Sequence, residues 1–458
     1  MRQITAPPRR QPNVLTIMVD QQRWDYLGYM GADWVDTPTI DRLAARGAVY
    51  THCYTNAPVC APARVAVASG LRPHRIGATD NACFLPQGIP TYYGRVRDAG
   101  YRVGCVGKLD LAKPDTYNGP HGCRPQAYSW GFTHPVEVEG KMHAGHSATP
   151  HGPYTQYLEE RGLLAQFHAD YQARGADWVG QCHDSLLPAE AFADRWIGSR
   201  AAQWLREIPG DFPWHLFVSF VGPHDPFDPP TEYADRYRER EMPGSIPHAP
   251  AGKPDHYARV GERSPELVLA CKRQYCAAIT AIDDAIAEIL AALEPRGWAD
   301  DTVIIFASDH GEQLYDHQRW TKGCPYESSL RVPLLISGPG IPAGRRLDTL
   351  VELIDIGETV CDLAGAVPCP GVDARSLLPS ASGQTDDHRD EVVSVLTQFR
   401  LIRDERWKYV ANIGAGHELY DLQADPEEQH NVAADQPGVA SEMKRRLTRA
   451  LATRILPR

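Results

Sequence analysis

The sequence predicts an α/β fold, with a doubly wound and mostly parallel sheet flanked by helices. Three observations predict it. Apolar runs of strand length recur along the chain, long helical patterns separate them, and polar residues follow several of the runs directly. With 458 residues, 43% of them hydrophobic, the chain is long enough to bury a large core.

The first strand is predicted at residues 14–19, a continuous apolar run that ends at Asp20. A helix is predicted next, at residues 37–47, because a proline stands in its first turn and a glycine ends the pattern. Four further apolar runs and two longer helical stretches continue the alternation. The runs are residues 101–106, 215–221, 302–307 and 333–337, and the helices are residues 189–208 and 265–293.

Residues 114–187 interrupt this alternation. They are rich in Gly, His, Pro and Tyr and have no clear periodicity, over a length that is unusual for a loop of a compact domain. We therefore expect this segment to be an insert that covers the active site.

The pattern changes again beyond residue 367. Three short runs typical of strands follow, and a helical stretch begins near residue 436. They predict a small antiparallel sheet with one helix, and so a catalytic domain of residues 1–367 and a C-terminal subdomain of residues 368–458. The three runs are residues 392–397, 399–403 and 407–411.

Composition limits the partners that we expect. The formal net charge is -11 and the sequence pI is about 5.9, so an extended basic surface for nucleic acid is not expected. An anionic substrate would need cations concentrated in one pocket. No apolar run reaches the roughly 18 residues that a membrane helix needs, so we expect no membrane span.

Two features concern the compartment. Residues 1–13 are polar and are not followed by the long apolar segment of a signal peptide, so we expect a cytoplasmic protein. The eleven cysteines have irregular spacing and form no CxxC pair, and we expect most of them to be reduced core residues.

The sharpest motif is Cys60-Ala-Pro-Ala-Arg64, which leads directly into a helical segment. Arg64 stands one helical turn beyond Cys60, so it can hold a group bound at Cys60 through charge-assisted hydrogen bonds. The N-terminus of the helix favours an anion at the same place. The motif therefore predicts an anion site at Cys60.

Two polar pairs follow predicted strands directly, Asp20-Gln21 and Asp309-His310. Because the carboxyl ends of parallel strands meet at one edge of a sheet, these four side chains are expected to lie close together. Carboxylate and amide oxygens are the ligands that hard divalent cations prefer. The sequence thus predicts a site for one divalent metal ion that would polarise a bound ester.

Three further residues supply positive charge or a proton: Lys108, His224 and Lys322. Each follows a strand or loop signal. A lysine offers a compact charge suited to an oxyanion, and a histidine can carry a proton near neutral pH. We expect all three in the same pocket, where they would give electrostatic stabilisation and acid catalysis.

In combination these motifs resemble the type I sulfatases of the alkaline phosphatase superfamily, from about residue 13 to residue 432. The resemblance implies an alkaline-phosphatase-like fold and oxidation of Cys60 to formylglycine by a formylglycine-generating enzyme. The hydrated aldehyde would be a metal ligand and the nucleophile that cleaves the S–O bond of an organic sulfate monoester through a covalent sulfo-enzyme. Lys108 and Lys322 would contact sulfate oxygens, and His224 would protonate or orient the leaving oxygen.

Some positions depart from the common family pattern. Gln21 and His310 stand where an Asp and an Asn are usual, which resembles the branch of choline sulfatases and phosphonate monoester hydrolases and leaves the metal open between Ca²⁺ and Mn²⁺. Asp110 replaces a frequent histidine, and we predict that it faces a cationic or hydroxyl group of the substrate. Asn81 is predicted to hydrogen-bond the transferring group, with a turn residue as the alternative.

Two alternatives remain at this point. The same scaffold could hydrolyse a phosphonate monoester or a phosphodiester, although two lysines supply more positive charge than a monoanionic diester needs. A catalytically silent anion-binding protein would keep the pocket but never receive formylglycine at Cys60. The chain is also predicted to form homo-oligomers in which residues 454–458 reach into a neighbour's pocket.

Overall fold

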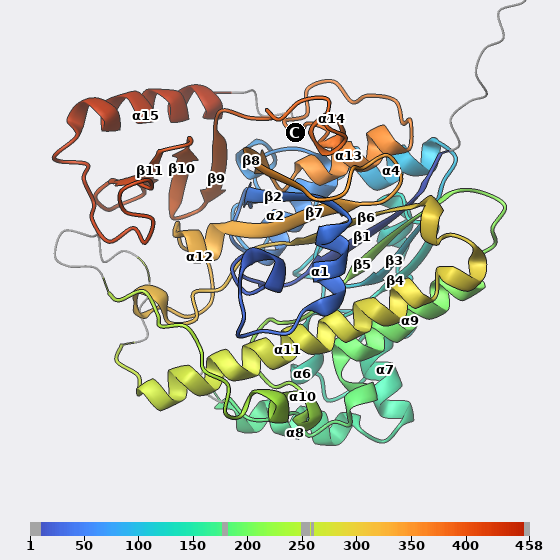
Figure 1. Ribbon diagram of the computed structural model, residues 1–458. Coiled ribbons are helices and arrows are strands. Elements are labelled where there is room, and N and C mark those ends of the chain that lie inside the picture. Colours follow the sequence, from blue (N-terminus) through green and yellow to red (C-terminus); the bar gives the residue numbers. More distant parts are fainter. Residues whose placement is uncertain (1–10, 176–181, 249–256, 258–260, 453–458) are drawn as a thin grey trace, which may run out of the picture.

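A large sheet of eight strands lies at the centre of the protein (Figure 1). The structure is a computed structural model, and it describes residues 11–175, 182–248, 257 and 261–452. The strand order is β4-β3-β5-β1-β6-β7-β2-β8. The strands are β1 (Asn13–Val19), β2 (Gly47–Tyr54), β3 (Arg102–Gly107), β4 (His134–Glu137), β5 (Trp214–Ser219), β6 (Thr302–Ser308), β7 (Arg331–Ser337) and β8 (Arg345–Glu352).

The sheet is parallel except at one strand. β7 runs antiparallel to both of its neighbours, β6 and β2, and the other adjacent pairs are parallel. The predicted mostly parallel α/β sheet is therefore confirmed. All five strands predicted for it are present, within two residues of the expected bounds.

Helices cover both faces of this sheet, and the central strand shows why. Val14 and Met18 of β1 pack in one hydrophobic cluster, whereas Leu15 and Ile17 pack in another, because alternate residues of a strand point to opposite faces. A strand buried on both sides needs a continuous apolar run. The first cluster includes α2 (Cys60–Ser69), α4 (Tyr92–Asp98) and α13 (Asp355–Leu363), and the second α1 (Pro38–Ala45), α9 (Ala193–Glu207) and α11 (Pro265–Ala291).

The predicted insert, residues 114–187, is more regular than its sequence indicated. Strand β4 extends the large sheet by pairing with β3, and three of the insert's helices bury apolar side chains in the second hydrophobic cluster. The segment is thus part of the core as well as a neighbour of the site. Its helices are α5 (Pro125–Ser129), α6 (Lys141–His146), α7 (Pro153–Glu160) and α8 (Leu164–Ala173).

A second sheet follows near the C-terminus, with the order β12-β11-β10-β9 and antiparallel pairing throughout. One face packs against α15, and the other packs against the region around β2 and α12. The predicted small sheet with one helix is confirmed, while the boundary at residues 367/368 stays a prediction. The elements of this subdomain are β9 (Val392–Leu396), β10 (Phe399–Arg403), β11 (Trp407–Asn412), β12 (Glu418–Asp421) and α15 (Pro437–Leu451). Four short helices occur earlier in the chain: α3 (Pro73–Ile76), α10 (Thr231–Ala234), α12 (Glu327–Leu330) and α14 (Leu378–Ala381).

One cysteine pair departs from the expected reduced state. Cys182 and Cys271 form a disulfide that joins the end of the insert to α11, while the other nine cysteines are free. Disulfides are rare in the cytosol, so this pair argues against the cytoplasmic location, which stays a prediction. No helix within the described residues is long and apolar enough to cross a membrane. The predicted reach of residues 454–458 into a neighbour falls outside the described residues.

Candidate active site

Four side chains with metal-binding atoms meet where strands of the large sheet end. Asp20 directly follows β1 and Asp309 directly follows β6, and these strands pair side by side up to Val19 and Ser308. Cys60 is the first residue of α2. His310 completes the group, and all four side chains are buried. The structure thus brings together residues that lie 250 positions apart in the chain.

The distances within this group suit a shared cation. The Cys60 Sγ lies 3.2 Å from His310 Nε2 and 3.6 Å from Asp20 Oδ1, and His310 Nε2 lies 3.6 Å from Asp309 Oδ1. One ligand atom from each residue lies within 4.8 Å of every other. Two carboxylates and an imidazole, beside the group at position 60, are donors that fit one divalent ion.

Arg64 connects the two carboxylates of the group. It lies one turn along α2 from Cys60, and its Nε donates to Asp309 Oδ2 at 2.7 Å while Nη2 donates to Asp20 Oδ2 at 3.3 Å. Its Nη1 donates to the backbone oxygen of Lys108 at 2.7 Å. Arg64 therefore fixes the position of both carboxylates, and its contact with a bound anion stays a prediction.

The surrounding charges favour negative charge at Asp20 and Cys60. Burial alone would raise the pKa of Asp20, but Lys108, His224 and Arg64 hold it well below its usual value. The Lys108 Nζ lies 2.5 Å from Asp20 Oδ2. Burial and Asp20 would likewise raise the pKa of the Cys60 thiol, yet Lys108 and Lys322 bring it well below the usual value. The site is built to hold an anion at position 60.

A second set of contacts organises Gln21, His224 and Lys322. The Lys322 ammonium donates to His224 Nε2 at 2.5 Å and to the side-chain oxygen of Gln21. The Gln21 amide nitrogen donates to Asp225 Oδ1 at 2.6 Å and to Glu312. Gln21 is thus held among Lys322 and two carboxylates, beside the cluster of metal-binding atoms, and its role as a ligand stays a prediction.

Asp110 and Asn81 already have partners within the protein. The Asp110 carboxylate contacts the ammonium groups of both Lys108, at 3.1 Å, and Lys113. Burial would raise the pKa of Asp110, but these two lysines hold it far below its usual value. The Asn81 side-chain oxygen accepts a hydrogen bond from the backbone N–H of Ala61 at 3.1 Å, in the first turn of α2. The predicted contacts of Asp110 and Asn81 with substrate stay predictions.

A cleft of about 290 Å³ opens over Cys60. Five of the predicted site residues line it, and α6 of the insert forms part of its wall, while the expectation that the insert covers the site stays a prediction. The lining residues are Cys60, Asn81, Lys108, Lys113, Gly140, Lys141, Met142, His143, His224, Thr321 and Lys322.

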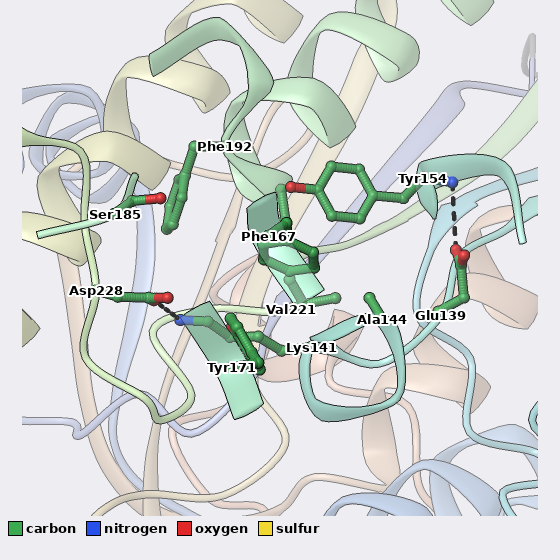
Figure 2. A pocket seen from close by; sticks show the side chains of 11 residues that line it. Glu139, Lys141, Ala144, Tyr154, Phe167, Tyr171, Ser185, Phe192, Val221 and Asp228 are labelled. Carbon is green, nitrogen blue, oxygen red and sulfur yellow. Dashed lines mark hydrogen bonds and ion pairs between the residues drawn. The ribbon is translucent and has the colours of Figure 1, made fainter. Parts of the chain in front are cut away.

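Lys141 attaches the insert to the loop that carries His224. Its ammonium donates to the backbone oxygens of His224 at 2.9 Å and Pro226 at 2.7 Å, and it forms an ion pair with Asp228 at 2.6 Å. Figure 2 shows Lys141 extended toward Asp228, with the ring of Tyr171 near it. The position of the His224 backbone therefore depends on a residue of the insert.

Sequence reasoning missed several residues that support the site. Asp225 and Glu312 lie beside predicted residues in the segments Gly222-Pro-His-Asp-Pro226 and Asp309-His-Gly-Glu312, so their proximity was a usable signal. Ser219, which accepts from Arg64 Nη1 at 2.6 Å, lies within the strand predicted at residues 215–221 and is the last residue of β5. Lys113 and Lys141 have no such signal, because they stand in or next to a segment without clear periodicity.

Known proteins share this fold over nearly the whole chain. The crystal structure of the phosphonate monoester hydrolase of Agrobacterium radiobacter matches with a TM-score of 0.77 and 26% identity, over 97% of this chain and 96% of that one. The choline-sulfatase of Rhizobium meliloti (strain 1021) is 30% identical, over 93% of this chain and 83% of that protein. An arylsulfatase of Clostridium perfringens (strain 13 / Type A) is 28% identical, over 92% and 90%.

The fold and the buried site together define a hydrolase of the alkaline phosphatase superfamily. Residues 12–366 match the family Sulfatase, and residues 315–454 match the family of N-sulphoglucosamine sulphohydrolase C-terminal regions. The chain therefore belongs to the sulfatase family and is an enzyme of that family. The resemblance and the fold predicted from the motifs around Asp20, Cys60 and Asp309 are confirmed.

Proposed function

We propose that this enzyme hydrolyses an organic sulfate monoester to an alcohol and sulfate, with formylglycine made from Cys60 as its nucleophile. The observation that carries the proposal is the place of Cys60. It lies at the base of the cleft, within the buried group of Asp20, Asp309 and His310, and faces Lys108 and Lys322. Cations therefore converge on the atom where a sulfate ester would react.

Four of the lining residues, and three buried residues next to Cys60, have roles that their positions support. Formylglycine would supply a hydrated aldehyde as nucleophile, and one Ca²⁺ or Mn²⁺ held by Asp20, Asp309 and His310 would polarise the ester. The Lys108 and Lys322 ammonium groups would bind sulfate oxygens and stabilise the charge that develops on them. His224 would protonate or orient the leaving oxygen once its Nε2, which accepts from Lys322 in this structure, carries a proton of its own.

Hydrolysis of a phosphonate monoester or phosphodiester is the second candidate. The observation that favours it is the likeness, at 26% identity, to the phosphonate monoester hydrolase of Agrobacterium radiobacter. The expectation that Lys108 and Lys322 favour the sulfate does not decide between the candidates, because a sulfate monoester, a phosphonate monoester and a phosphodiester each carry a single negative charge. Both reactions transfer a group with the same tetrahedral shape, so low activity toward the second class of ester is expected.

One preparation, co-expressed with a formylglycine-generating enzyme, tests these functions. Peptide mass spectrometry over Cys60 is combined with turnover of an aryl sulfate, a phosphonate monoester and a phosphodiester. Formylglycine with the sulfate preferred supports the proposal, and a preference for the phosphonate or diester supports the second candidate. An intact Cys60 without turnover of any ester would instead indicate a silent anion-binding protein.

A substitution pair completes the test. Cys60→Ala should reduce turnover by at least about a thousandfold, because no other side chain can replace the nucleophile. Cys123→Ala is the matched control, since Cys123 is a free and exposed cysteine outside the cleft. Equal activity of Cys60→Ala and the control would contradict the proposal.

A further inference from the structure

The wall of the cleft has an unusual composition. Among its described residues are four lysines and two histidines, but no carboxylate and no phenyl, phenol or indole ring. A sulfate group bound at the base occupies only part of a space of about 290 Å³. The remainder of the substrate would lie against the less buried lining residues. Among them are Lys113, Met142 and His143, which we call the upper wall of the cleft.

Three of the four lysines are engaged by dedicated partners. Lys108 lies 2.5 Å from Asp20, Lys141 lies 2.6 Å from Asp228, and Lys322 contacts Gln21 and His224. These contacts tie each ammonium group to the floor of the cleft or to the loop that carries His224.

Lys113 is different. Its carboxylate partner is Asp110, and the same oxygen, Oδ2, also contacts Lys108 at 3.1 Å. Asp110 is thus shared between Lys113 and Lys108, although Lys108 is also paired with Asp20. The Lys113 side chain is 17% exposed, against 4% for Lys108, so it lies nearer to the mouth of the cleft. It is well placed to take a second negative group from a ligand.

His143 lies in the same positive electrostatic potential, and its pKa shows the effect. Burial lowers the pKa of His143, and the ammonium groups of Lys113 and Lys108 lower it further against the opposing effect of Asp110. A neutral imidazole at this place can donate one N–H to an anion without needing a proton from solvent. Lys113 and His143 therefore present donors from opposite segments, the loop after β3 and helix α6.

We infer that the sulfate ester hydrolysed at this site carries a second anionic group, such as a carboxylate or a sulfonate, which binds Lys113 at the upper wall of the cleft. The inference rests on the proposed function and specifies its substrate class. Lys113 then acts as a specificity residue. Binding of the second anion would give Lys113 a partner of its own beside Asp110, which it shares with Lys108.

The same wall disfavours a cationic substrate. A quaternary ammonium group is held by aromatic faces or by carboxylates, and the described lining of this cleft offers neither. Lys113 would repel such a group. The chain is 30% identical to a protein named choline-sulfatase, and we expect the two to differ in the charge that they accept beside the sulfate.

Matched esters test the inference in enzyme shown to contain formylglycine. The first comparison uses two esters with an anionic substituent, 3-(carboxymethyl)phenyl sulfate and 3-(sulfomethyl)phenyl sulfate. They are compared with 3-(carbamoylmethyl)phenyl sulfate, whose substituent is neutral and whose leaving group is similar. We expect kcat/KM to be at least about tenfold higher for each charged ester. The second comparison uses choline sulfate and the isosteric 3,3-dimethylbutyl sulfate, which lacks the quaternary ammonium charge. Choline sulfate should be the poorer substrate.

Lys113→Met should reduce kcat/KM for the two charged esters by about tenfold more than for the carbamoyl ester, and so remove the preference. Lys113→Arg should keep the preference, and Lys444→Met, an exposed lysine on α15, serves as the control. Thermal unfolding confirms that each variant is folded.

Three results would overturn the inference: equal turnover of charged and uncharged esters by the native enzyme, a preference for choline sulfate, or an equal loss for all esters in Lys113→Met. The last result would mean that Lys113 acts only by holding Asp110. Failure of formylglycine-containing enzyme to hydrolyse any sulfate ester would instead contradict the proposed function, so the two failures are distinguishable.

Discussion

Asp20 and Asp309 are two buried carboxylates at adjacent strand ends, and Arg64 donates to both. Removing a carboxylate from water is costly unless a cation compensates it. Burial would lower the pKa of Arg64, but these carboxylates raise it above its usual value. Arg64 therefore keeps the pair charged and aligned, which is what a divalent ion requires of its ligands.

Metal binding should be visible in the stability of the protein. An ion at about 100 times its dissociation constant stabilises the native state by about 2.7 kcal/mol, provided that it does not bind the unfolded chain. We expect a chelator to lower the melting temperature and Ca²⁺ or Mn²⁺ to restore it, measured by thermal unfolding.

Asp309→Asn should abolish this response to metal, whereas Asp98→Asn, at an exposed position of α4, should retain it. A native enzyme whose melting temperature ignores both chelator and added metal would refute the metal site.

The main site residues could be predicted because the ends of buried strands can be recognised in the sequence. Asp20 and Asp309 follow apolar runs, and Cys60 stands in a short motif. The partners of the predicted residues could not be predicted. Nothing local in the sequence indicates that the Gln21 amide faces Lys322, or that Asp110 lies between two lysines, since these contacts depend on loop conformations set by tertiary packing.

At the scale of elements, helix α6 is the connection between the insert and the reacting centre. Lys141 on this helix uses its ammonium group to bind Asp228 and two backbone oxygens, those of His224 and Pro226. Under the proposed function, the insert would act on the reaction through the position of His224.

Lys141→Met should impair acid catalysis selectively. We expect kcat to fall by about 100-fold for an alkyl sulfate, whose leaving group needs protonation, and much less for a nitrophenyl sulfate. His224→Asn should show the same dependence on the leaving group, and the double variant should be no slower than His224→Asn alone. Steady-state kinetics over a series of leaving groups measures this.

Combining Lys141→Met with Asp228→Asn avoids leaving an uncompensated buried carboxylate. A uniform loss for all leaving groups in this combination would mean that Lys141 serves only the stability of the fold.

Element prediction succeeded where the local pattern was strong and failed where pairing decides the structure. The runs at β1, β3, β5 and β6 are buried on both faces, so they read as continuous apolar strands. β4 has only four residues, and β8 has exposed charged residues in its first half, so neither shows such a run. The reversed direction of β7 has no sequence signal, because apolar runs are alike in parallel and antiparallel pairs.

At the scale of the whole molecule, a buried ion cluster joins the two sheets. Lys408 of β11 lies 3.0 Å from Glu327 of α12 and also contacts Glu428, while Tyr54 of β2 donates to Glu327 at 2.7 Å. Burial would raise the pKa of Glu327, but Lys408, Arg403 and Arg331 lower it to about 2. The ionised Glu327 thus stabilises the contact between the sheets.

This cluster predicts a loss of stability in acid. Because the folded-state pKa of Glu327 is lowered, its contribution is fully present above the unfolded pKa of about 4.3 and is lost as pH falls through about 2. Glu327→Gln should lower the unfolding free energy at pH 7 by up to about 3 kcal/mol, and this difference should shrink between about pH 5 and pH 2. Denaturant unfolding across that range measures it.

Glu160→Gln, at an exposed position of α7, is the control. A stability difference between Glu327→Gln and the native enzyme that stays constant over the whole pH range would contradict this account.

The burial of Cys60 also bears on whether its side chain can be modified before or after the chain folds. Cys60 is 1% exposed in the folded protein, so a second enzyme cannot reach the thiol once α2 is packed against the sheet. Under the proposed function, conversion to formylglycine would therefore precede folding, and a molecule that folds first would stay inactive. Treating the folded, unmodified protein with the maturing enzyme should leave Cys60 a thiol, while a peptide of residues 55–70 should be converted.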